Sequence, residues 1–130
     1  MLGAPVLVED TALTFTALGS LPGPLIKWFL ISLGIEGLVK LLDGYEDRTA
    51  RAEVCFVLHD ENGPHFFKGS IDGTISTEPK GEKGFGWDPV FIPNDYEQTW
   101  GQMDIDQQRD TSMRREVLLK LQTFLGENYQ

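Results

Sequence analysis

The 130-residue chain has little cysteine and no long apolar run, and each absence excludes a class of protein. Its single cysteine, Cys55, excludes an internal disulfide and suits a reducing compartment. No apolar run approaches the length of a membrane span, and the first residues lack a charged-then-apolar signal pattern. A Walker A loop and a Rossmann glycine fingerprint are also absent. We therefore expect a soluble cytoplasmic protein that does not use those two nucleotide-binding motifs.

Basic residues are also scarce, with 11 lysines and arginines against 20 aspartates and glutamates and a formal charge of -9. Such a surface repels nucleic acid polymers and anionic membranes, so neither is expected as a partner. A small anionic substrate then needs local basic groups or a bridging cation. The hydrophobic fraction of 41% is ordinary for a globular protein, and the length predicts one domain over residues 1–130.

The pattern of apolar residues predicts strands mixed with helices, which indicates an α/β or α+β fold with a mixed sheet. Val6-Leu7-Val8 is a continuous apolar run and is predicted to be a short buried strand that ends in Glu9-Asp10. The other predictions are helices over 24–33, 36–42 and 110–125, strands over 51–59, 65–71 and 90–92, a hairpin turn at 60–63 and a polar loop over 77–84.

The segment Lys83–Pro89 alternates glycines with aromatic residues and ends in a carboxylate before proline. Glycines let the backbone approach a ligand closely, and the aromatic faces of Phe85 and Trp87 can stack on a planar base. Asp88 can accept hydrogen bonds from a base or sugar. The alternative interpretation is a glycine-rich loop whose two aromatic side chains anchor it to the core. Taken alone, the segment leaves both interpretations open.

Two carboxylates, Glu9 and Asp10, directly follow the first predicted strand. Ligands of open α/β sheets gather outside the carboxyl ends of strands, and Mg²⁺ binds one or two carboxylates together with substrate phosphates. One of the pair could also deprotonate a water molecule. The alternatives are a solvated strand end and a capping role for Asp10 in the next turn.

The candidate cations are Lys27 in the first predicted helix and the arginines Arg109, Arg114 and Arg115 near the last one. Lys27 suits a phosphate contact or a solvated helix face. The planar guanidinium of arginine suits recognition of phosphates and carbonyls. The alternative is a set of exposed helix charges that pair with nearby acidic residues.

Several of these segments together resemble the inosine triphosphate pyrophosphatase family, in order and spacing and over nearly the whole chain. The matching segments are Pro5–Leu13 (PVLVEDTAL), Leu18–Phe29 (LGSLPGPLIKWF), Phe67-Lys68-Gly69, Phe85–Phe91 (FGWDPVF) and Tyr96–Trp100 (YEQTW). The resemblance implies an elongated α/β fold with a long mixed sheet and flanking helices, and a homodimer. It implies Mg²⁺-dependent hydrolysis of inosine and xanthosine triphosphates to the monophosphate and pyrophosphate.

The resemblance also assigns roles to residues of this chain. Asp10 corresponds to the metal-binding, water-activating carboxylate, with Glu9 beside it as a second metal ligand. Phe85, Trp87 and Asp88 would form the purine pocket, and Lys27 would lie on the phosphate side. Ser112 and Arg114 match parts of a Ser-His-Arg base-recognition motif.

Three departures from the family pattern put catalysis in question. The resemblance implies that the family's N-terminal portion, with its phosphate-binding loop and a metal-binding glutamate, is missing, which would leave room for an altered or swapped dimer. Met113 stands where the motif has histidine, and it cannot donate or titrate like imidazole. Gln108 stands where a lysine is expected, and its neighbour Arg109 is a candidate substitute. The competing hypotheses are therefore an active pyrophosphohydrolase and an impaired homologue that binds a nucleotide or a protein partner.

Overall fold

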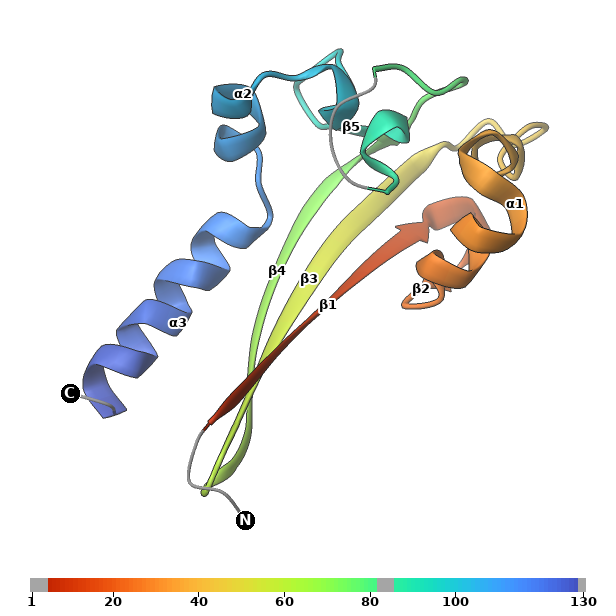
Figure 1. The fold of residues 1–130 in the computed structure, drawn as a ribbon. Helices are drawn as coiled ribbons and strands as arrows, with labels where there is room; N and C mark the ends of the chain where they lie inside the picture. Colours follow the sequence, from red (N-terminus) through yellow and green to blue (C-terminus); the bar gives the residue numbers. More distant parts are fainter. Residues whose placement is uncertain (1–4, 82–85, 129–130) are drawn as a thin grey trace.

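The computed structural model describes residues 5–81 and 86–128, which form a five-stranded sheet with helices packed around it (Figure 1). The strand order is β2-β1-β3-β4-β5, and the three long central strands run side by side. The strands are β1 (Val6–Phe15), β2 (Pro22–Gly23), β3 (Thr49–Asp60), β4 (Gly63–Ile75) and β5 (Phe91–Pro93).

The α/β class is confirmed, and the sheet of the described residues has one feature that differs from the expectation. Every pair of neighbouring described strands is antiparallel, whereas the sequence predicted a mixed sheet. For β3 and β4 the reason is local, because a tight hairpin joins them, with Asp60 opposite Gly63, and such a short connection can only join antiparallel strands. The predicted hairpin turn at 60–63 is confirmed.

The first and last of the long helices agree with the apolar periodicity, including a break that the sequence predicted, whereas the helix over 105–110 was not predicted. Helix α1 (Ile26–Lys40) is interrupted at Gly34, whose φ of 72° lies in the left-handed region that glycine tolerates. The two predicted helices over 24–33 and 36–42 therefore correspond to the two halves of α1. The remaining helices are α2 (Ile105–Asp110), α3 (Arg114–Asn128) and the short 3₁₀ turns η1 (Thr16–Leu18), η2 (Asp88–Val90) and η3 (Trp100–Gln102). None of the helices within 5–81 and 86–128 is both long and apolar enough to cross a bilayer.

Strand alternation gives the sheet two different faces. Along β1, Leu13 and Phe15 are fully buried, and they pair in register with the buried Ala52 and Ala50 of β3. We call this side, which carries the odd-numbered residues of β1 and the even-numbered residues of β3, the covered face. We call the opposite side the open face. It carries the even-numbered residues of β1, including Asp10, and the odd-numbered residues of β3, including Cys55, the register partner of Asp10. None of these residues is buried.

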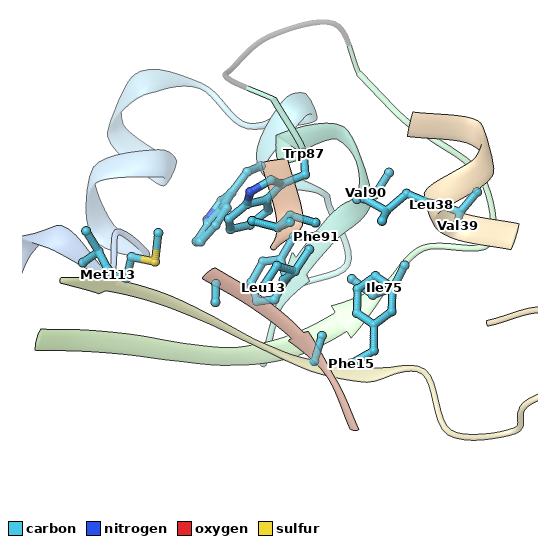
Figure 2. Close-up of a cluster of buried hydrophobic side chains, with 14 of the residues drawn as sticks. Leu13, Phe15, Leu38, Val39, Ile75, Trp87, Val90, Phe91 and Met113 are labelled. Atoms are coloured by element: carbon cyan, nitrogen blue, oxygen red, sulfur yellow. The ribbon is translucent and has the colours of Figure 1, made fainter. Parts of the chain in front are cut away.

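The core lies on the covered face, beneath α1, α3 and the segments around η2 and η3 (Figure 2). Leu38 and Val39 of α1 pack near Ile75, while Trp87 and Phe91 lie over Leu13. Since close packing of apolar side chains stabilises the fold most, the covered face carries most of the stability of the sheet.

The beginning of β1 differs from the prediction of a short buried strand. Val6, Leu7 and Val8 are 56%, 49% and 47% exposed, and the strand continues to Phe15. Strand β2 pairs only with Leu13 and Thr14, so the earlier part of β1 forms a sheet edge among the described strands. Thr11 and Ala12 are partly buried, and Leu13 is the first buried residue of the strand.

Arg48 ties the end of α1 to the end of β4. Its guanidinium donates to the carbonyl oxygens of Val39 at 3.1 Å, Ile75 at 3.0 Å and Ser76 at 2.7 Å. One mostly buried side chain thus satisfies carbonyl groups from both elements.

Candidate functional site

A cavity of about 460 Å³ opens on the covered face between β1, the segment around η2 and the start of α3. Several elements contribute to it because β1 places alternate side chains toward the helices that cover the sheet. Its walls mix aromatic rings, carboxylates, an arginine and small hydroxyl groups. The lining residues are Glu9, Thr11, Trp87, Asp88, Trp100, Gln108, Ser112, Met113 and Arg114.

Two tryptophans form the aromatic wall of this cavity. The rings of Trp87 and Trp100 lie 5.7 Å apart, and each also packs against Phe91, at 5.9 Å and 4.7 Å. Trp87 is only 6% exposed and stands over the core cluster in Figure 2. The indole Nε1 of Trp100 donates to Thr111 Oγ1 at 2.8 Å. The ring of Trp87 anchors its segment to the core, as the alternative interpretation predicted, and it also lines the cavity. Stacking of this ring on a base stays a prediction.

The start of α3 lies directly on β4 because residue 69 has no side chain. A Cβ at Gly69 would collide with the carbonyl oxygen of Met113 and the side chain of Val117. The backbone N–H of Arg114 donates to Ser112 Oγ at 3.1 Å, which satisfies one of the free donors at the helix N-terminus. Close packing and the cap together fix Ser112, Met113 and Arg114 at the cavity.

Glu9 and Arg114 form an ion pair across this cavity. Arg114 Nε donates to Glu9 Oε1 at 2.5 Å, and the two side chains are 37% and 39% exposed. Such a charge-assisted contact connects residues 105 positions apart in the sequence. It joins β1 to the first turn of α3.

Asp10 lies on the open face, on the opposite side of β1 from Glu9. It lines a second hollow of about 270 Å³ together with Glu53, Cys55 and Lys68. Asp10, Cys55 and Lys68 occupy one row across β1, β3 and β4, because Cys55 is the register partner of both. The carboxylate doublet that the sequence predicted to act together is thus divided between the two faces.

The remaining predicted site residues lie outside the cavity or outside the described residues. Lys27 is exposed in the first turn of α1 and lines neither hollow. Arg109 is exposed on α2 and pairs with Asp106 at 3.8 Å, while Arg115 pairs with Asp110 at 3.9 Å. These two pairs match the alternative interpretation of exposed helix charges. Phe85 lies outside the described residues.

Four lining residues, Thr11, Trp100, Gln108 and Met113, were not predicted as part of a site. Thr11 follows from the alternation of β1, since it is two residues beyond Glu9 on the same face. Gln108 was noted only as a departure from the family pattern; its Nε2 donates to the carbonyl oxygens of Trp100 at 2.9 Å and Met103 at 3.4 Å. Trp100 was part of the matching YEQTW segment, but no local signal placed it beside Trp87.

Within residues 5–81 and 86–128, no group of three or more histidine, cysteine, aspartate or glutamate side chains is arranged to hold a metal ion. Any cation at Asp10 would therefore depend on ligands from elsewhere, such as substrate phosphates. The cavity itself supplies hydrogen-bond donors and acceptors beside an aromatic wall, which is an arrangement suited to a flat polar ring.

Comparison with known proteins gives consistent matches over almost the whole chain. The chain is 47% identical over 131 residues to the inosine triphosphate pyrophosphatase of Yarrowia lipolytica, covering 98% of this chain and 68% of that protein. Its structure resembles that of a HAM1 protein from Coxiella burnetii, with a TM-score of 0.83, 30% identity and coverage of 96% of this chain and 68% of that one. It also resembles the nucleoside-triphosphatase, or dITP/XTP pyrophosphatase, of Mycobacterium abscessus, with a TM-score of 0.76, 26% identity and coverage of 92% and 67%. The Ham1 family model matches residues 1–124, and with these likenesses in sequence and structure the chain belongs to the Ham1 family.

Proposed function

We propose that this chain is a pyrophosphohydrolase that converts inosine or xanthosine triphosphate and water into the monophosphate and pyrophosphate. The observation that carries the proposal is the cavity lined by Trp87, Trp100, Asp88 and Arg114 in a chain 47% identical to a protein named inosine triphosphate pyrophosphatase. A purine ring matches the aromatic wall of this cavity in shape and polarity.

The polar groups of the cavity suit a 6-oxo purine. The 6-oxo group accepts hydrogen bonds, and Arg114 has five N–H donors, of which Nε is bound to Glu9. The carboxylate of Asp88 is an acceptor and suits a ring N–H of the same base. Adenine presents an amino group at the 6 position, so the same arginine would face a donor with a donor.

The triphosphate would extend from the cavity along the open edge of β1 toward Asp10. This path is supported by the strand order, since no described strand pairs with β1 before Leu13 on that side. Asp10 is exposed and can accept a proton from the attacking water. The water oxygen bonds to the α-phosphorus, and pyrophosphate leaves with the bridging oxygen. Lys27 is proposed to bind phosphate at this edge.

A divalent cation, proposed to be Mg²⁺, suits the donor chemistry of the open face. Asp10 and Glu53 line the same hollow, and Mg²⁺ prefers one or two carboxylates together with substrate phosphates. Asp10 would hold the cation, which supplies neutralisation of the triphosphate charge when bound. Without it, this acidic chain would repel its substrate.

Turnover of the purified chain tests the proposal. With inosine triphosphate and Mg²⁺, we expect inosine monophosphate and pyrophosphate in equal amounts, resolved by ion-exchange chromatography. Asp10→Asn should lower kcat/KM by about 100-fold or more, because a general base contributes about that much. The matched control is Asp72→Asn, an open-face carboxylate paired with Arg51 at 2.8 Å, which should leave the rate unchanged. Release of inorganic phosphate, or equal rates for Asp10→Asn and wild type, would contradict the assignment.

An impaired homologue that only binds the nucleotide is the second candidate, and Met113 is the observation that favours it. Met113 is 4% exposed and lines the cavity at the position where the family motif has a titratable histidine. Inosine monophosphate binding without turnover above the Asp10→Asn background would favour this candidate over the enzyme.

We further propose a cytoplasmic homodimer that does not bind nucleic acid polymers or membranes. The charge of -9 supports the exclusion of polyanionic partners. The exposed apolar residues Val6, Val8 and Phe66 at one end of the sheet support a second copy as partner. A monomer mass by light scattering would rule out the dimer.

A further inference from the structure

Glu9 has a defined partner that the sequence prediction did not include. Its Oε1 accepts a hydrogen bond from Arg114 Nε at 2.5 Å, and both side chains line the cavity on the covered face. Asp10, its neighbour, lies on the other side of the strand and lines a different hollow. The contacts of Glu9 therefore connect it to the cavity and not to the carboxylate beside it.

The contact at Nε fixes the orientation of the guanidinium group. The group is planar, so a hydrogen bond at Nε restricts rotation about the last torsions of the side chain and sets where the two Nη nitrogens lie. The backbone of Arg114 is also held, because its N–H donates to Ser112 Oγ at 3.1 Å. Arg114 is thus held at both ends, and within residues 5–81 and 86–128 its Nη donors have no hydrogen-bond partner, so they are available to a ligand.

A metal-binding role for Glu9 would compete with this ion pair. A carboxylate that binds a cation at Oε1 must give up its short contact to Arg114, or share the oxygen between two positive groups. Asp10 cannot complete such a site from the opposite face, since successive side chains of a strand point to opposite sides of the sheet.

We propose that Glu9 is a positioning residue, which orients Arg114 so that its Nη donors meet the 6-oxo group of the purine. The proposal rests on the proposed function in one respect, namely that a purine occupies this cavity. Through Arg114, Glu9 sets the preference for 6-oxo over 6-amino bases, and it does not act on the phosphates or on the cation.

Binding of monophosphates without metal isolates this effect. Inosine monophosphate and adenosine monophosphate are titrated in EDTA, and the quenching of Trp87 and Trp100 fluorescence is followed in a Trp28→Phe background, since the chain has three tryptophans. We expect Glu9→Ala to weaken inosine monophosphate about tenfold and adenosine monophosphate less than twofold. Glu9→Gln keeps a neutral acceptor and should fall between wild type and Glu9→Ala. Asp72→Asn, which breaks an ion pair outside the cavity, should change neither affinity.

A double-mutant cycle with Arg114→Ala tests whether the two residues act as a unit. Glu9→Ala should add less than a twofold loss when Arg114 is already absent, because interacting residues are not additive. Circular dichroism of each variant confirms that it is folded. The half-saturating Mg²⁺ concentration for turnover should be the same in wild type and Glu9→Gln.

Three results would overturn the proposal. Unchanged inosine monophosphate affinity with a tenfold rise in half-saturating Mg²⁺ would make Glu9 a metal ligand. Equal weakening of both monophosphates would make its role merely structural. Failure of the wild type to bind inosine monophosphate would remove the purine site and the proposal with it. Absence of turnover alone would contradict the proposed enzyme and leave the Glu9 result standing.

Discussion

The two faces of the sheet differ in what covers them, and β1 contributes an adjacent carboxylate to each. On the covered face, Glu9 pairs with Arg114 at the rim of a cavity that helices and aromatic rings build. On the open face, Asp10 shares a shallow hollow with Glu53 and Lys68, and none of the strand residues there is buried. In the proposed function, base selection would therefore depend on packing, whereas the reaction proposed at Asp10 would depend on charge and on groups that the ligand brings.

The difference means that substitutions on the two faces should have separable effects. A change on the covered face should lower stability and base recognition together, because the same packing builds the core and the cavity. A change on the open face should alter reaction or assembly at nearly constant stability.

The largest effect is expected at Leu13, which is fully buried on the covered face. Leu13→Ala should lower the free energy of unfolding by about 2–5 kcal/mol, because it leaves a cavity beneath Trp87 and Phe91. Its neighbour Thr14 lies on the open face, and Thr14→Ala should cost below about 1 kcal/mol. Urea denaturation followed by circular dichroism measures both; equal losses would mean that the two faces do not differ in packing.

A smaller loss is expected from Gly69→Ala, which adds one methyl group beneath α3. The new Cβ would meet the backbone of Met113, so the helix must move, at a cost of about 1–3 kcal/mol. Inosine monophosphate affinity should fall with stability, since Ser112 and Arg114 move with the helix. The control is Gly126→Ala on the same helix, where a Cβ meets no other atom and should stabilise by up to about 1 kcal/mol. Full affinity in a Gly69→Ala variant would show that the start of α3 does not position the site.

The smallest effect on stability is expected at Phe66, which is 62% exposed on the open face in one row with Val8 and Val57. Phe66→Ser should change the free energy of unfolding of the monomer by about 0.5 kcal/mol or less. If the row of Val8, Val57 and Phe66 joins two copies, the same substitution should halve the mass measured by light scattering. Trp28→Gln on α1, also at a position 62% exposed, should leave the mass unchanged. A dimer that survives Phe66→Ser places the interface elsewhere.

Local sequence signals were sufficient for much of the fold. The alternation of residues 51–59 and the turn residues at 60–63 predicted the β3–β4 hairpin, and the break between two apolar periodicities predicted the kink of α1 at Gly34. Helix α2 was not predicted, although its capping box was readable: Asp104 Oδ1 accepts from the Gln107 N–H at 2.8 Å, and the Gln107 side-chain oxygen accepts from the Asp104 N–H at 3.2 Å.

The site could be predicted only in part, because its assembly depends on long-range packing. Alternation shows that Glu9 and Asp10 point to opposite faces, but only the placement of α3 shows which face has the cavity. The burial predicted for Val6-Leu7-Val8 was wrong because an apolar run does not reveal whether another element covers it. The contact between Glu9 and Arg114 spans 105 positions, and no local spacing encodes it.

The three hydrogen bonds of Arg48 have a consequence for how the molecule can deform. One guanidinium binds the carbonyl oxygens of Val39 near the end of α1, of Ile75 at the end of β4 and of Ser76 just after it. The end of α1 and the end of β4 should therefore move together as a single rigid body. The opposite flank is joined differently, because the first turn of α3 is held at the cavity by the partly exposed ion pair of Glu9 and Arg114. We therefore expect the domain to deform more easily on the α3 side than on the α1 side.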